Sequence, residues 1–84
     1  MSERDRILWN CRRGLLELDL VLVRFVDEHL EKLDPAGIVA FQKLLEYPDN
    51  DLLDLVMGRA ELVEDVECVP VLALLRQTKA LPAL

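Results

Sequence analysis

The sequence CRRGLLELD, residues 11–19, lies between two segments that have helical patterns. It places two arginines and a glycine directly before an apolar run that carries two carboxylates. Glycine is unfavourable inside a helix because its backbone is the freest of any residue, and it tolerates the positive φ angles of tight turns. We therefore predict that a first helix ends near Arg12, that the chain turns at Gly14, and that a second helix begins near Leu15.

The two helices beside this turn have clear patterns. Ser2 is a suitable N-cap for the first helix, with acidic residues in the first turn, where the helix dipole favours them. The second helix is predicted to run to Leu33. Its polar stripe, which should face solvent, contains Glu17, Arg24, Glu28 and Glu31. Its apolar side, which should face the core, contains Leu15, Leu18, Leu22, Val23, Phe25, Val26, Leu30 and Leu33.

Proline, glycine and short polar residues mark two further helices. Asp34 suits the N-cap and Pro35 the first position of a third helix over residues 35–46. A fourth helix is predicted over 51–57, with its cap supplied by the acidic cluster 49–51. Gly58 is a suitable residue to end it, because a helix often closes with a residue in the left-handed region.

The last helix is predicted over residues 66–79, after an acidic linker. Its regular part should begin nearer Val69, because Pro70 removes a backbone donor. Leu72 and Leu75 are expected to face inward with Val69, and Ala73 is a further candidate. The predicted fold is therefore all-α, a small bundle of about five short helices in a single domain over 1–84, with a loose C-terminal tail at about 80–84.

The composition argues against several classes of function. The 84 residues carry a net charge of −6, with a pI near 4.6, whereas binding to nucleic-acid phosphates or to an anionic membrane requires a basic surface. No run approaches the roughly 20 apolar residues of a membrane-spanning helix. The first residues, MSERDRILW, lack the apolar segment of a secretion signal. We therefore expect a cytoplasmic bacterial protein.

Residues that often carry chemistry are sparse in this chain. Cys11, Cys68 and the single histidine, His29, do not have the paired spacing of a zinc site. Two buried, reduced thiols are the simplest interpretation of the cysteines, and His29 is expected to be solvated among acidic neighbours. The sequence also contains no evident nucleophile–base pair or glycine-rich phosphate loop. No metal site and no catalytic residue is therefore predicted.

Asp19 lies on the apolar side of the second helix, where a lone carboxylate would be costly. It therefore needs a partner, and the candidates are the side chain of Arg12 or Arg13, or free backbone amides near the helix start. We interpret Asp19 as a structural buried charge that ties the first helix to the second.

The pair Arg13-Gly14 has two interpretations. Either it forms an exposed corner whose guanidinium projects to recognise a carboxylate, a phosphate or a flavin oxygen, or it is a bent connection with a solvated arginine. Trp9, the only tryptophan, either fills the core or lies at a binding surface, where tryptophan is enriched. The residue types leave these alternatives open and indicate no more than an acidic helical interaction module.

Several motifs together give the chain a family resemblance. The segment Arg13 to Glu17 fits the signature R-G-x-x-E, and Leu44-Leu45-Glu46 followed by Asp49 to Leu52 fits the pattern L-L-E…D-x-D-L. The chain thereby resembles the succinate dehydrogenase assembly factor 2 family, whose bacterial members are called SdhE. Further matching positions are Trp9, Cys11, Arg12, Leu18, Asp19, Phe25 and the basic residues from Arg76 to Lys79. Two departures are Leu15, where the family often has Met, and the Tyr47-Pro48 loop.

The resemblance implies an assembly factor and not an enzyme. Members of the family bind the flavoprotein subunit of succinate dehydrogenase or fumarate reductase and promote covalent attachment of FAD to a histidine of that subunit. The FAD thus belongs to the partner, and the chain would have no cofactor of its own. Apart from the resemblance, we expect the acidic chain to be a monomer when free, and the alternative is a weak dimer through an exposed leucine face. Carried over by position, the partner-binding residues are Arg13, Gly14 and Glu17, with Trp9 as a neighbour. The alternative is an antitoxin-like or regulatory protein-binding module built on the same acidic bundle.

Overall fold

The computed structural model describes residues 2–78 and has five α-helices and two short 3-10 helices in that range. No strand occurs among these residues, so the predicted all-α bundle is confirmed. The predicted tail at 80–84 lies outside the described residues. In chain order the elements are α1 (Glu3–Asn10), α2 (Leu16–His29), η1 (Leu30–Lys32), α3 (Pro35–Leu45), α4 (Asp49–Met57), η2 (Val66–Cys68) and α5 (Val69–Gln77).

The helices begin and end largely where their end signals predicted. Ser2 caps α1 in a reciprocal capping box with Asp5, and Asp34 caps α3 by accepting a hydrogen bond from the Gly37 amide at 2.7 Å. Gly58 ends α4 in the left-handed region, with φ +80°. These local hydrogen bonds satisfy backbone groups that a helix end leaves unpaired.

Two predicted helix boundaries are wrong. The fourth helix begins at Asp49, with Pro48 at the cap position and no side-chain cap, because Pro48 has the extended backbone that a cap position needs. The second helix ends at His29 and continues as the 3-10 turn η1, so it does not run unbroken to Leu33.

The core lies between the helices, and its members are mostly those predicted. Val69 and Ala73, however, are exposed. They lie four residues apart on the outer side of α5, because Leu72 and Leu75 occupy its inner side. Val23 of α2 is also exposed, whereas Val21 is buried. The buried apolar residues are Ile7, Cys11, Leu18, Val21, Leu22, Phe25, Val26, Leu30, Ala40, Phe41, Leu44, Leu45, Leu52, Leu55, Val56, Cys68, Val71, Leu72 and Leu75.

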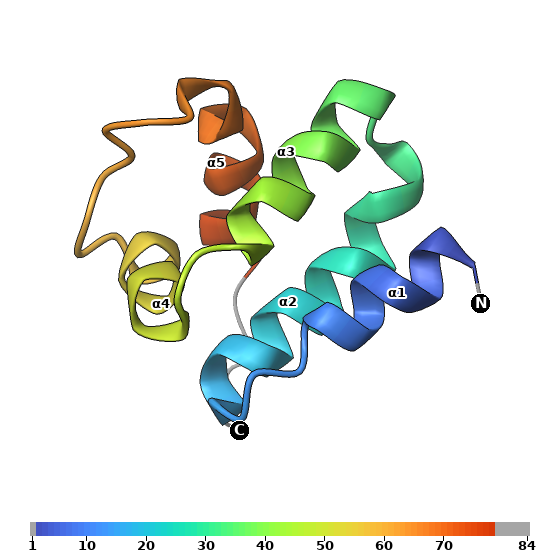
Figure 1. Ribbon diagram of the computed structural model, residues 1–84, viewed down its shortest axis with the longest axis horizontal. Helices are drawn as coiled ribbons and strands as arrows, with labels where there is room; N and C mark the ends of the chain where they lie inside the picture. Colours follow the sequence, from blue (N-terminus) through green and yellow to red (C-terminus); the bar gives the residue numbers. More distant parts are fainter. Residues whose placement is uncertain (1, 79–84) are drawn as a thin grey trace.

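The five α-helices form two sides of one small body (Figure 1). On one side α1 and α2 run in opposite directions, and Arg4 of α1 pairs with Asp27 near the end of α2 at 3.3 Å. On the other side α5 contacts both α3 and α4. None of the helices within residues 2–78 has the length and apolar character needed to cross a bilayer.

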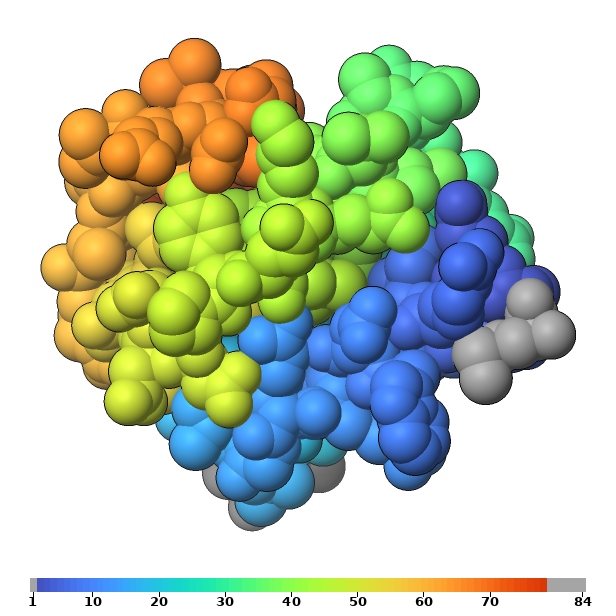
Figure 2. Space-filling model, in the orientation of Figure 1, coloured from blue at the N-terminus to red at the C-terminus, as the bar shows by residue number. Residues whose placement is uncertain are grey.

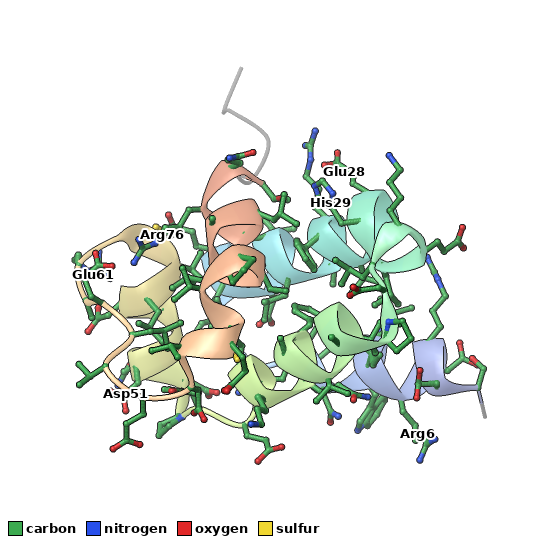
Figure 3. All side chains as sticks on the ribbon, turned by 90° about the horizontal axis from the view of Figure 1, so that it is seen from above. Arg6, Glu28, His29, Asp51, Glu61 and Arg76 are labelled. Carbon is green, nitrogen blue, oxygen red and sulfur yellow. The ribbon has the colours of Figure 1, made fainter. Side chains whose placement is uncertain are left out.

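Arg76 fastens the long loop after α4 to α5. Its guanidinium donates hydrogen bonds to the carbonyl oxygens of Leu55 and Ala60, both at 2.8 Å, and reaches toward Glu61 (Figure 3). Arginine suits this role because its planar fork presents several donors at fixed angles. These hydrogen bonds hold the loop against α4 and α5.

Candidate functional site

The connection between α1 and α2 turns at Gly14, as the sequence predicted. Gly14 is exposed and has φ +82°, and a Cβ added to it would meet no atom within 4 Å. Glycine is therefore required here by the backbone conformation and not by crowding within the chain. The result is a corner at which the backbone is open to an approaching molecule.

Asp19 holds this corner in place from the first turn of α2. Its Oδ1 accepts a hydrogen bond from the Arg13 amide at 2.8 Å, and its Oδ2 accepts one from the Gly14 amide at 3.1 Å. Of the partners that the sequence left open, the free amides are the ones used. Asp19 is partly buried, and its carboxylate ties the Arg13-Gly14 segment that follows α1, and not α1 itself, to α2.

Replacing Asp19 with alanine should lower the free energy of unfolding by about 1–3 kcal/mol, because two backbone donors lose a charged acceptor. Chemical denaturation measures this loss directly. Asp19→Asn should cost less, since its amide oxygen can still accept one of the two bonds. An unfolding curve for Asp19→Ala that coincides with that of the wild type would show that the carboxylate does not stabilise the corner.

Arg13 does not project into solvent, and this expectation from the sequence is wrong. Only 12% of its side chain is exposed. Its Nε donates to the carbonyl oxygen of Asn10 at 2.8 Å, and Nη2 donates to that of Leu45. Its Nη1 donates to the Tyr47 carbonyl at 3.2 Å and to Asp49 Oδ1 at 3.0 Å.

The Arg13 guanidinium thus joins three helices. Asn10 and Leu45 are the last residues of α1 and α3, whose carbonyl groups lack partners within their own helices, and Asp49 is the first residue of α4. The Arg13 side chain lies inward because four acceptors are gathered there, and its guanidinium donates a hydrogen bond to each of them. Arg13 is a clamp that fixes the corner against the α3–α4 loop.

Trp9 lies on the surface, so the interpretation that it fills the core is wrong. It is 67% exposed, and the Arg12 guanidinium lies over its ring, 5.7 Å from the ring centre. The two border a cleft of about 540 Å³ between the end of α1 and the end of α3. On the face drawn in Figure 2, the blue surface of this N-terminal segment meets the yellow-green surface of the end of α3. The cleft is lined by Trp9, Asn10, Arg12, Arg13, Gln42, Leu45 and Glu46.

Glu17 is exposed in the first turn of α2, as its place on the polar stripe predicted. It makes no hydrogen bond or ion pair within residues 2–78, whereas Arg24 and Glu28 on the same stripe pair at 2.9 Å. The Glu17 carboxylate is therefore available to a cation or donor from outside.

The remaining reactive residues are set deep in the fold or packed against it. Cys11 and Cys68 are free and buried, as predicted. Burial raises the pKa of the Cys11 thiol to about 12, so it stays protonated and unreactive at neutral pH.

The prediction that His29 is solvated is wrong. His29 is half-buried with its ring 5.1 Å from that of Phe25, because it follows Phe25 by one helical turn. No group of three or more metal-binding side chains occurs in the described part of the chain.

Sequence analysis missed the partners that α3 and its loop contribute to the site. The acceptors of Arg13 at positions 45, 47 and 49 follow it by more than thirty residues, and Gln42 and Glu46 complete the cleft wall. The available signal was the L-L-E…D pattern, which contains three of these positions. From the sequence, this pattern supported only the family resemblance, and the structure shows that it meets R-G-x-x-E in space.

A family model and several relatives are similar to this chain. A family model described as flavinator of succinate dehydrogenase matches residues 5–79. The FAD assembly factor SdhE of Legionella pneumophila (strain Lens) is 44% identical over 59 residues, which are 70% of this chain and 75% of the relative. The FAD assembly factor SdhE of Aliivibrio fischeri is 52% identical over 57 residues, which are 68% of this chain and 66% of the relative.

The aligned region thus spans about two thirds to three quarters of these relatives. No solved structure matches the chain significantly. The family model, by contrast, covers nearly all of the described residues, including both helices beside Gly14 and the α3–α4 loop. The chain therefore belongs to the family of succinate dehydrogenase flavinators.

Proposed function

We propose that this chain is an assembly factor that binds the flavoprotein subunit of succinate dehydrogenase, or of the related fumarate reductase, and promotes covalent attachment of FAD to that subunit. It works in the bacterial cytoplasm as a monomer when free. It is not an enzyme, and the FAD belongs to the partner. Family membership and the relatives' shared name, FAD assembly factor, support this function.

The observation that carries the proposal is the fixed, open corner at Gly14. Asp19 binds both amides of the Arg13-Gly14 pair, and the Arg13 guanidinium anchors the same segment to α3 and α4. A loop held from both sides keeps one conformation, so binding costs little ordering entropy. Because Gly14 has no side chain, a partner backbone can approach the corner closely.

The residues around the corner have different roles in this proposal. Gly14, Glu17 and Trp9 contact the flavoprotein, with Glu17 offering a carboxylate and Trp9 a large aromatic surface. Arg13 is a positioning residue, since its donors are already bound within the chain. Its role is thus to shape the binding surface, not to reach across it.

Docking at this corner would act by holding the partner in the arrangement that brings its histidine and flavin together. A reaction between two groups is accelerated greatly when both are kept in contact and aligned. An assembly factor can supply this by binding one conformation of the partner more tightly than others. The chemistry then takes place in the partner's own site.

Covalent flavin on the partner tests the proposed function. Apo-flavoprotein subunit is incubated with FAD, with and without this chain, and the denatured subunit is scored by in-gel flavin fluorescence. We expect this chain to raise the fluorescent fraction and to co-purify with the subunit. Binding without any change in flavin attachment would favour the regulatory module, and absence of both effects would refute the proposal.

Glu17→Ala should reduce flavin attachment at least severalfold without lowering the thermal midpoint, because the exposed carboxylate has no partner within residues 2–78. Glu31→Ala is a matched control, since Glu31 is an exposed carboxylate on η1, beyond the far end of α2. Thermal unfolding and the flavinylation assay are run on both variants. A clear drop in the midpoint of Glu17→Ala would instead assign Glu17 a structural role.

A further inference from the structure

One face of α2 carries apolar side chains that the core does not use. Leu16 is 75% exposed, Leu20 51% and Val23 38%. Their spacings of four and three residues place them on the same side of the helix, and we refer to these three residues as the α2 stripe. Exposed apolar side chains aligned along one face of a helix are typical of a surface that another molecule covers.

The α2 stripe is continuous with the corner. Leu16 is the first residue of α2, two residues after Gly14, and Glu17 follows it directly. Apart from Trp9 on α1, which the proposed function already uses, the other large exposed apolar residues of the described chain lie on α3, on the loop after α4 and on η2–α5. These residues are Val39, Val63, Val66 and Val69. Of the large exposed apolar residues in the described part of the chain, only those of the α2 stripe share a helix with Glu17.

The charges beside the α2 stripe indicate what covers it. Asp27 lies one turn beyond Val23 on the same face and is paired with Arg4 of α1, while Glu17 has no partner within residues 2–78. A second copy of this chain would bring a net charge of −6 against another −6, which opposes self-association. The complementary surface is apolar and carries an arginine or lysine opposite Glu17.

We infer that the α2 stripe is the apolar half of the surface that docks the flavoprotein subunit, with the partner's apolar residues lying along Leu16, Leu20 and Val23. This inference rests on the proposed function and adds to it a second contact region. The open corner fixes the orientation of the partner, and the stripe supplies the apolar area that the small corner lacks. The partner surface is apolar and bordered by a basic residue.

The double variant Leu16→Gln/Leu20→Gln tests this inference. Glutamine keeps helix propensity and length while removing the apolar surface. The control is Val63→Gln/Val66→Gln, which changes two exposed apolar residues elsewhere. Affinity for the flavoprotein subunit is measured by biolayer interferometry, with the thermal midpoint of each variant measured in parallel. We expect the dissociation constant to rise at least about tenfold for the stripe variant and less than about twofold for the control.

The results separate this inference from the proposed function. A wild-type chain that does not bind the flavoprotein would refute both. If the wild type and the stripe variant bind the flavoprotein equally well, the inference about the α2 stripe is overturned and the proposed function stands. Sedimentation of the free chain supplies a further check, because a wild-type dimer that is lost in the stripe variant would assign the stripe to a second copy and overturn the inference.

Photo-crosslinking keeps the inference testable if the double variant folds poorly. A chain with p-benzoylphenylalanine in place of Leu20 is irradiated with the flavoprotein subunit and compared with a chain that has the same group in place of Val63. We expect a crosslink to the flavoprotein from the first position and not from the second. Equal crosslinking from both positions, or none from Leu20, would contradict the inference.

Discussion

Gly14→Arg is expected to abolish binding of the flavoprotein subunit while leaving the chain folded. Gly14 has φ +82°, and a Cβ added there meets no atom within 4 Å, so the cost to the fold is that of an L residue in the left-handed region. That conformation costs roughly 1–2 kcal/mol. The arginine side chain would occupy the space that the partner backbone is proposed to use. Affinity measurement by biolayer interferometry and thermal unfolding report the two effects separately.

Gly58→Arg is a control for the backbone strain of this substitution. Gly58 has φ +80°, is exposed, and also has no atom within 4 Å of an added Cβ, but it ends α4 away from the corner. The two variants should therefore lose similar stability, and only Gly14→Arg should lose binding. Comparable affinity of both variants for the flavoprotein would show that Gly14 is needed for folding geometry alone.

Arg13→Lys is expected to destabilise the chain by about 2–4 kcal/mol, because one ammonium group cannot serve the acceptors that the guanidinium fork binds. Those acceptors lie at the ends of α1 and α3 and at the start of α4, and the side chain is largely buried. For a domain of this size the thermal midpoint should fall by roughly 10–25 °C. Flavin attachment should fall with it, since the corner loses its anchor.

Arg12→Lys is the matched control for Arg13→Lys. Arg12 is the preceding residue, is exposed, and contacts the Trp9 ring. Its replacement by lysine should change the free energy of unfolding by less than about 0.5 kcal/mol. Equal losses of stability in the two variants would contradict the clamp described for Arg13.

The local features of the site could be predicted from sequence because their causes are local. The turn at Gly14 follows from the freedom of glycine, and the caps at Ser2 and Asp34 follow from short side chains that reach nearby amides. The need of Asp19 for a partner followed from its place among apolar residues. The partners proved to be amides only five and six residues upstream.

The orientation of Arg13 could not be predicted in the same way. Its acceptors include backbone carbonyls of Leu45 and Tyr47, which are brought to it only when α3 ends beside α1. Carbonyl groups are present at every position, so no residue type marks the ones that a distant arginine will bind. A pattern of side chains therefore identifies Arg13 as unusual but does not show whether it faces solvent or the chain.

The hydrophobic periodicity of α2 also predicted a wider buried face than the structure has. The apolar residues of α2 cover more of the helix than its neighbours do, so Val23 was placed in the core and is exposed. Leu16 and Leu20 belong to the same uncovered part of the helix. Hydrophobic periodicity shows which side of a helix avoids water, but only the packed structure shows how much of that side the chain itself covers.

The central claim is that the Gly14 corner docks the flavoprotein subunit and thereby promotes FAD attachment. The most direct test measures the yield of covalent flavin on the apo-subunit, after a fixed time with FAD, in the presence of wild-type chain, Gly14→Arg or Gly58→Arg. The wild type and Gly58→Arg are expected to raise the yield, while Gly14→Arg leaves it at the level reached without any factor. Equal stimulation by the wild type and Gly14→Arg, or no stimulation by the wild type, would contradict the claim.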